Sequence, residues 1–228
     1  KQNITIEDGF FNNNRLVGID VSDGNVTGLT ITGNTVENNG DAGISVLGAK
    51  APGANLISNN RVTNNGRYGI EIKNSTGSGS DSGAGSIVVA GNIVARNIAA
   101  TDLRDYGGIV IIRRAPVAGS NDDQPSGIVI INNEVRNFNR AATAPSDQDG
   151  FGISVEGLNN TVSNNIVAGN DIGIQVQGGC NGNQGAGSDG LPADACFGRG
   201  DAAQGSALVE LNSIVGNGIG LRTVGNVT

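Results

Sequence analysis

The chain has 228 residues, of which 38 are glycine and 3% are aromatic, with no histidine, methionine or tryptophan and a net charge of −7. This acidic balance argues against a nucleic-acid partner, because binding phosphate groups requires a surplus of lysine and arginine. The lack of histidine excludes Ser-His-Asp and Cys-His catalysis and histidine-based zinc sites. No apolar run approaches the ~18 residues of a membrane span, so we expect no membrane insertion.

One phrase recurs along the chain and predicts how it is organised. It is clearest at 34–46, NTVENNGDAGISV, and returns at 60–72, 165–176 and 212–221, with looser copies around Gly9, Asn92 and Asn133. In each copy, Asn and Gly supply tight turns, while Val and Ile alternate with polar residues as in short strands. The seven copies predict one continuous solenoid over 1–228 rather than separate domains.

Aligning the copies gives three columns of equivalent residues. The first column is Gly9, Asn34, Asn60, Asn92, Asn133, Asn165 and Asn212, and the second is Asn14, Asn39, Asn65, Asn97, Phe138, Asn170 and Asn217. The third column is a Gly-apolar pair that begins at Gly18, Gly43, Gly69, Gly108, Gly152, Gly173 and Gly220, and these pairs number coils one to seven. Each copy therefore predicts two short strands and two turns.

Stacked coils would place equivalent residues directly above one another. An Asn in such a turn can adopt the left-handed backbone conformation at low cost, and its amide can bond the Asn of the next coil. We therefore expect an asparagine ladder. Inward Ile and Val would stack in the same way into a narrow aliphatic core that a single coil could not build.

The NNxVxNNGxxGIxV phrase resembles the repeat of right-handed parallel β-helix proteins in the pectin-lyase-like superfamily, and the match covers essentially the whole chain. Repeat and resemblance together predict an all-β, right-handed parallel β-helix of about seven coils. A left-handed β-helix would show strict hexapeptide periodicity, which is absent. The superfamily includes polysaccharide lyases, hydrolases and epimerases, and also phage tailspikes, surface adhesins and periplasmic sugar-binding proteins, so the fold does not fix an activity.

Insertions are concentrated in the middle and late coils. They follow the Gly-Ile strand at 74–85, 113–126 and 178–206, and they precede it at 98–107 and 139–150. Loops at both ends of one strand column would wall a groove, where enzymes of the superfamily commonly place their sites. If the Gly-Ile isoleucines point inward, the outward residues that floor this groove are Asp20, Ser45, Glu71, Val110, Ser154 and Gln175, followed two positions later by Ser22, Leu47, Lys73, Ile112, Glu156 and Gln177. The apolar Val110 and Ile112 count against an active site on coil four.

No catalytic residue can be carried over from the superfamily, because the chain matches the motif of no single lyase family. The candidates for a lyase are Lys73, Arg104 and Arg113, since β-elimination beside a uronate carboxyl group needs a base and cations that stabilise the developing charge. Hydrolysis would need two carboxylates across the glycosidic bond. The central loops offer Asp102, Asp105, Asp122, Asp123, Asp147 and Asp149, with no pair singled out.

For ligand binding we expect an exposed aromatic step formed by Tyr68 and Tyr106, beside the polar residues Glu71, Ser154 and Glu156. No cofactor is expected, with the exception of calcium. Carboxylates and carbonyls in Asp-rich loops can bind this ion, and the candidates are Asp122, Asp123, Asp147 and Asp149.

Cys180 and Cys196 bracket a Gly-rich insertion, and a disulfide closing this loop would suit a protein that is secreted or displayed on the cell surface. The first and last segments, 1–6 and 221–228, look like parts of unfinished coils. We therefore expect a segment of a longer protein, or a unit that stacks on copies of itself or on neighbouring domains.

Two functional classes remain open. The first is a non-catalytic β-helix scaffold of a surface, adhesive or filament-forming protein that contacts a polysaccharide, which the missing histidine and the scarce aromatics favour. The second is a polysaccharide lyase, epimerase or hydrolase, which the superfamily and the paired loops favour. The first is preferred.

Overall fold

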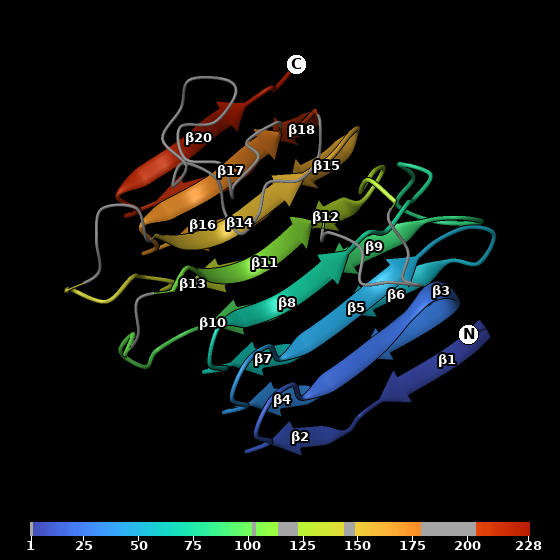
Figure 1. Ribbon diagram of the computed structural model, residues 1–228, viewed down its shortest axis with the longest axis horizontal. Coiled ribbons are helices and arrows are strands. Elements are labelled where there is room, and N and C mark those ends of the chain that lie inside the picture. Colours follow the sequence, from blue (N-terminus) through green and yellow to red (C-terminus); the bar gives the residue numbers. More distant parts are fainter. Residues whose placement is uncertain (1, 102–103, 114–122, 144–148, 179–203) are drawn as a thin grey trace.

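The structure is a computed structural model that describes residues 2–101, 104–113, 123–143, 149–178 and 204–228. These residues form β-strands and no helix, and the strands lie in a 13-stranded sheet and a 7-stranded sheet. Neighbouring strands are parallel in both sheets. Figure 1 shows them stacked from β1 at the N-terminal end to β20 at the C-terminal end. The chain is an all-β, right-handed parallel β-helix, as predicted.

Each full coil contributes one strand to each of three parallel arrays. Sheet 1 follows the Gly-apolar column and contains β3 (Ile19–Thr32), β5 (Ile44–Ala49), β8 (Tyr68–Lys73), β11 (Tyr106–Ile112), β14 (Gly150–Glu156), β17 (Ile172–Gly178) and β20 (Ile219–Gly225). Sheet 2 contains β1 (Gln2–Glu7), the second half of β3, β6 (Asn55–Ser58), β9 (Ile87–Ala90), β12 (Val129–Ile131), β15 (Asn160–Ser163) and β18 (Ala207–Glu210). Sheet 3 contains β2 (Phe10–Asn12), β4 (Thr35–Glu37), β7 (Arg61–Thr63), β10 (Ile93–Ala95), β13 (Glu134–Arg136), β16 (Ile166–Ala168) and β19 (Ser213–Val215).

Sheet 2 corrects the expectation of two strands per copy, because it supplies a third. Its strands pair in register, as in Ile57 with Val89 and Val89 with Ile130. All three of these side chains are buried and close one side of the core. The strands of sheet 2 follow insertions of unequal length. Their residues therefore do not fall at equivalent positions when the copies of the repeat are aligned.

The core consists of stacked aliphatic side chains that point into the coil. In sheet 1, Ile44 pairs with Ile70, Ile70 with Ile109, and Ile109 with Ile153, and all four are fully buried. The predicted stack through these residues is confirmed. Burying each isoleucine is worth about 1.5–3 kcal/mol, so the coils stabilise one another mainly through this column and its counterparts in sheets 2 and 3.

The first asparagine ladder runs unbroken through six coils. The side-chain amide nitrogen of each residue donates to the next side-chain oxygen at 2.9–3.0 Å, from Asn34 through Asn60, Asn92, Asn133 and Asn165 to Asn212. The rungs are separated by 26, 32, 41, 32 and 47 residues along the chain. Insertions of different length therefore leave the stacking of this turn unchanged.

The ladder residue itself is not the one in the left-handed conformation, which corrects our expectation for these turns. Positive φ angles occur at the residue just before the ladder position, as at Asn59 (53°), Asn132 (56°) and Asn164 (55°). Gly33 and Gly91 take the same place before Asn34 and Asn92. Two adjacent residues thus divide the two roles, one reversing the chain and the other joining the coils.

The second asparagine column is interrupted at coils four and five. Ladder contacts join Asn14 to Asn39 and Asn39 to Asn65, and they resume between Asn170 and Asn217. Between them, Phe138 takes the ladder position and packs in the core, while Asn97 is exposed and only its backbone nitrogen bonds the coil below. The predicted place of Asn97 in the ladder is wrong. The preceding residue, Arg96, is buried instead of Asn97.

Candidate functional site

The outward column predicted for sheet 1 has the expected register. Ser45 lies beside Glu71, Glu71 beside Val110, and Val110 beside Ser154, so the candidate site residues of neighbouring coils are adjacent. Their accessibility changes along the β-helix. Asp20 on coil one is exposed, whereas Ser154 is fully buried.

An apolar cluster covers the middle of the outer face of sheet 1. Val110 and Ile112 are 0% exposed and pack with Tyr68, Phe151 and Ile172. The part of the outer face that β11 contributes is therefore apolar and buried. That coil four holds no active site stays a prediction.

The groove floor expected on coil five is buried as well. Ser154 and Glu156 are both 0% exposed, so the floor is closed rather than open. Contact of these two residues with a ligand stays a prediction. Their burial means that a ligand could reach them only after the surrounding chain moves.

The expectation of an exposed aromatic step is wrong. Tyr68 is 2% and Tyr106 is 0% exposed. Gly107, not Tyr106, pairs with Tyr68, and a shift of one residue turns the Tyr106 ring to the interior face of the strand. Each ring instead stacks under an arginine, Arg67 at 4.5 Å and Arg96 at 4.0 Å from the ring centres.

The lyase candidates do not meet in one centre. Lys73 ends β8 and pairs with Ile112, so Lys73 and Arg113 lie at the same end of sheet 1. Arg104 precedes the other end of β11, a strand of seven residues that spans about 23 Å at ~3.3 Å per residue. Lys73 is itself engaged, since its Nζ lies 3.4 Å from Glu71 Oε2 and donates to Ser45 Oγ at 2.8 Å.

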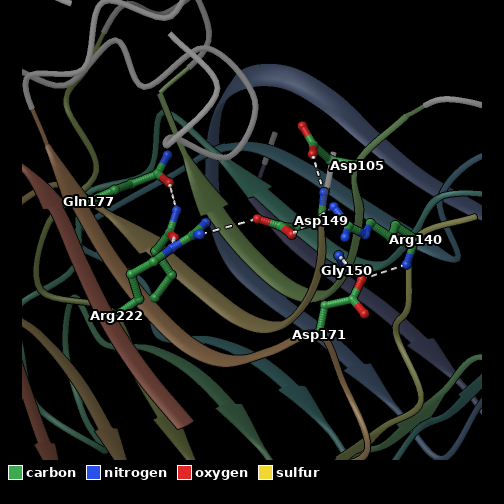
Figure 2. Close-up of polar contacts among 8 residues, drawn as sticks. Asp105, Arg140, Asp149, Gly150, Asp171, Gln177 and Arg222 are labelled. Carbon is green, nitrogen blue, oxygen red and sulfur yellow. Dashed lines mark hydrogen bonds and ion pairs between the residues drawn. The ribbon is translucent and has the colours of Figure 1, made fainter. Parts of the chain in front are cut away.

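A polar network on coils five to seven forms the most developed charged site in the described part of the chain (Figure 2). Asp149 Oδ2 lies 3.2 Å from Arg222 Nη1, and Asp149 Oδ1 lies 4.0 Å from Arg140 Nη1. The Arg222 side chain also donates to Gln175 Oε1, and Gln175 Nε2 donates in turn to Gln177 Oε1 at 2.6 Å. Alternation along the strand predicted that Gln175 and Gln177 lie on this face. No sequence pattern predicted the contact between Arg222 and Asp149.

Asp149 is the ionisable group whose environment is most altered in this network. Burial raises the pKa of Asp149 above its ordinary value of 3.8. Arg222 lowers that pKa through its charge and hydrogen bond, and the nearby charge of Asp171 raises it. Because burial outweighs the arginine, Asp149 holds a proton more readily than an exposed aspartate does.

Asp171 fastens the segment that carries Asp149. Its Oδ2 accepts hydrogen bonds from the backbone N–H of Arg140 at 2.6 Å and of Gly150 at 2.8 Å. The backbone N–H of Asp149 donates to Asp105 Oδ1 at 3.1 Å. Figure 2 shows these carboxylates grouped around the start of β14. Arg140 and Gly150 are thereby both tied to Asp171, the residue just before β17.

The calcium candidates that can be placed are engaged with cations. Asp123 Oδ2 lies 3.2 Å from Lys50 Nζ, and Asp149 pairs with Arg222. Asp122, Asp147, Cys180 and Cys196 lie outside the described residues. Within the described ranges, no group of three or more His, Cys, Asp or Glu residues could hold a metal ion. No cofactor is confirmed.

Comparison with known families gives one match. The model of the NosD family, described as periplasmic copper-binding protein, matches residues 1–112, just under half of the chain. Comparison with curated proteins and with solved structures gives no match. Among the residues that the structure describes, no helix is long and apolar enough to cross a membrane.

The described residues contain none of the side chains that copper prefers. Copper binds imidazole, thiolate and thioether groups, whereas the chain contains no histidine and no methionine, and its two cysteines, Cys180 and Cys196, lie outside the described residues. The similarity to NosD therefore supports the architecture and the location rather than the metal. This chain is a parallel β-helix protein similar over residues 1–112 to a periplasmic family, which agrees with the predicted location outside the cytoplasm.

Proposed function

We propose that the chain is a non-catalytic β-helix scaffold of an exported surface, adhesive or filament-forming protein, and that it contacts glycans through the outer face of sheet 1. We also propose that the chain is a member of the pectin-lyase-like superfamily. It is supported by the stacked coils and by the similarity to a periplasmic family.

The observation that carries the proposal is the mutual neutralisation of the charged groups on sheet 1. Glu71 and Lys73 are 3.4 Å apart, and Asp149 and Arg222 are 3.2 Å apart. Lys73 Nζ also donates a hydrogen bond to Ser45 Oγ at 2.8 Å, so this lysine is held between two partners. A face built of ion pairs and amides suits binding of hydroxyl groups better than proton transfer.

Glycan contact is proposed for coils one to three, where the outer face of sheet 1 keeps some exposed polar groups although Ser45 and Glu71 are buried. Asp20 and Ser22 are exposed there and contact each other, and Lys73 is partly exposed. Carboxylate, hydroxyl and ammonium groups can all bond sugar hydroxyls. The proposal also includes contacts with other copies of the chain or with neighbouring domains.

Asp149 supports the second candidate, a polysaccharide-active enzyme. A carboxyl group whose pKa is raised by burial is suited to act as a general acid, and arginines on two sides could hold an anionic substrate. The second carboxylate or base that such chemistry needs is not singled out by the described geometry.

A glycan array probed with the purified chain tests the proposal. We expect binding to at least one glycan class, weakened in Lys73→Ala and unchanged in Arg61→Ala, which alters an exposed arginine on sheet 3. An array without any bound glycan would contradict the glycan role. Equal weakening by the two variants would contradict its location on sheet 1.

A further inference from the structure

The side of the coil that forms sheet 3 has the same length in every copy of the repeat. The first and second asparagine columns are always five residues apart, as from Asn60 to Asn65 and from Asn165 to Asn170. The insertions all lie in other parts of the coil. The seven strands of sheet 3 therefore stack in register on one uninterrupted side of the β-helix (Figure 1).

The outer face of sheet 3 leaves apolar side chains exposed in the middle coils, where the other two sheets have theirs covered. Val110 on sheet 1 is 0% exposed, and Val88 and Val129 on sheet 2 are 4% and 3% exposed. Ile93 and Ile166 on sheet 3 are both 42% exposed. Each of the two begins its strand and points outward, because the valine that follows it is buried in the core.

A hollow of about 360 Å³ lies between Ile93 and Ile166. Glu134, on the strand between them, lines it together with Asn132 and Asn164. Both asparagines are exposed, and among the described residues their side-chain amides make no hydrogen bond. The hollow thus combines apolar walls with a carboxylate and two amides, which suits the long apolar stem and the charged tip of an arginine.

The outer face of sheet 3 carries balanced charge on an acidic chain. Its charged residues are Glu37, Arg61, Glu134 and Arg136, two of each sign, whereas the whole chain has a net charge of −7. Arg61 is exposed and, within the described part of the chain, has no ion-pair partner. Glu134 pairs with Arg136 through Oε1, so its second oxygen can accept a bond from another cation. Two copies can therefore approach through this face without the repulsion that their net charges would cause elsewhere.

A two-fold axis parallel to β10 would match these charges between two copies. The copies would face each other with opposite coil order, so that coil three of one lies against coil five of the other. Arg61 on coil three then meets the hollow over Glu134 on coil five, and the same contact occurs a second time in reverse. Ile93 on coil four meets Ile93 at the centre. A shift by one coil in either direction would place Arg61 on an isoleucine instead.

We propose that sheet 3 of one copy docks face to face on sheet 3 of a second copy, with Arg61 of each in the hollow of the other. The stem of Arg61 lies between Ile93 and Ile166, and its guanidinium pairs with Glu134. This inference rests on the contact between copies that the proposed function includes, and it names the surface that makes the contact.

The narrow face predicts a weak dimer. Strands of three residues span about 10 Å, and seven of them stack over about 30 Å, so the contact is smaller than the ~800 Å² per partner of a standard interface. We expect a dissociation constant of about 0.1–1 mM. At the far lower protein concentration of a glycan array the chain is monomeric, so Arg61→Ala remains a valid control there.

Sedimentation equilibrium of the intact chain from about 10 µM to about 2 mM tests the proposal. We expect a reversible monomer–dimer equilibrium that stops at the dimer, because a two-fold contact is closed. A monomer at every concentration would overturn the proposal. Assembly that continues beyond the dimer would indicate end-to-end stacking of coils and would also overturn it. Glycan binding by a chain that stays monomeric would refute this inference alone and leave the glycan role intact.

Variants locate the contact. Ile93→Lys should abolish the dimer, whereas Ile98→Lys, at a side chain of similar exposure (44%) outside sheet 3, should not. Arg61→Glu and Glu134→Arg should each weaken the dimer about tenfold, because like charges then face each other.

An equal mixture of the Arg61→Glu and Glu134→Arg proteins is the decisive sample. Both contacts of the mixed dimer again join opposite charges, so we expect it to form about as strongly as the parent dimer. Thermal unfolding of each variant at low concentration checks that the fold is intact. Folded variants whose mixture dimerises no better than either protein alone would overturn the two-fold contact.

Discussion

At the scale of single residues, the turns of this β-helix depend on a pair of neighbours with different tasks. The first residue of each pair has a positive φ and is usually Asn or Gly, which adopt this conformation at low cost. The second supplies the amide that bonds the next coil. Leu211, with φ of 54°, occupies the first position before Asn212 and carries a bulky side chain there, unlike Asn59 or Gly91.

We predict that Leu211→Asn stabilises the protein by about 1 kcal/mol, because a branched side chain in the left-handed conformation is strained. Leu211 is 76% exposed, so the substitution sacrifices little buried surface. Urea unfolding of variant and parent measures the difference. Leu208→Asn, in the neighbouring strand β18, is the matched control and should bring no gain. Equal effects of the two substitutions would contradict the assignment of strain to Leu211.

Asp149 gives the protein a predicted dependence on pH. Because burial raises its pKa, the folded state binds this proton more tightly than the unfolded state does. The free energy of unfolding should therefore fall as pH rises from the ordinary value of 3.8 through the raised pKa, and this contribution should be constant above it. Asp149→Asn removes the titrating group, so the stability of the variant relative to the parent should increase across that range.

Urea titrations of parent and Asp149→Asn at a series of pH values measure this difference directly. Asp81→Asn, at an exposed carboxylate remote from the network, serves as control. Parallel curves for the parent and Asp149→Asn would show that the carboxyl group of Asp149 has no altered affinity for its proton in the folded state.

At the scale of elements, a coil is stable because its three strands and its ladder residue all bond to the coils on either side. Asn133 illustrates the connection. Its amide nitrogen donates to Val89 and Ile131 carbonyls and to Asn165, and its oxygen accepts from the backbone and side chain of Asn92. The residue is buried, so water cannot replace these bonds.

We predict that Asn133→Ala lowers the free energy of unfolding by about 3–5 kcal/mol, since it leaves buried donors and acceptors on two neighbouring coils without partners. Asn132→Gly, one residue earlier, keeps the positive φ of the turn and should have little effect. Thermal and urea unfolding compare the two. If both variants lost the same stability, turn conformation rather than the ladder would join the coils.

The sequence predicted sheets 1 and 3 because their turns carry Asn and Gly at repeating positions. It missed sheet 2, whose strands such as β9 and β12 follow loops of different length and carry no such signature. It also placed Tyr106 on the wrong face, since alternation along a strand fails when the register moves by one residue.

The Asp149 network was only partly predictable, for a related reason. Gln175 lies on a strand, so alternation placed it outward. Asp149 lies just before β14, and neither its ion pair with Arg140 nor the bonds that Asp171 accepts from Arg140 and Gly150 involve residues of the repeat columns. No periodic pattern specifies such contacts, so neither the pairing with Arg222 nor the raised pKa could be read from the sequence.

At the scale of the whole molecule, the fold is a long acidic scaffold with a continuous aliphatic core and sheet 1 as its most varied face. On coil one Asp20 and Ser22 are exposed on that face, on coil four Val110 and Ile112 are buried, and coils five to seven hold the Asp149 network. This division is in line with the proposed scaffold role.

The most direct test of this account is turnover of the glycans that the chain binds. Each bound polysaccharide is incubated with the protein, with and without calcium, while unsaturated uronate absorbance and new reducing ends are followed. The account predicts binding without product. Product that appears with the parent protein and disappears in Asp149→Asn would contradict the scaffold role and establish an enzyme with Asp149 in its active site.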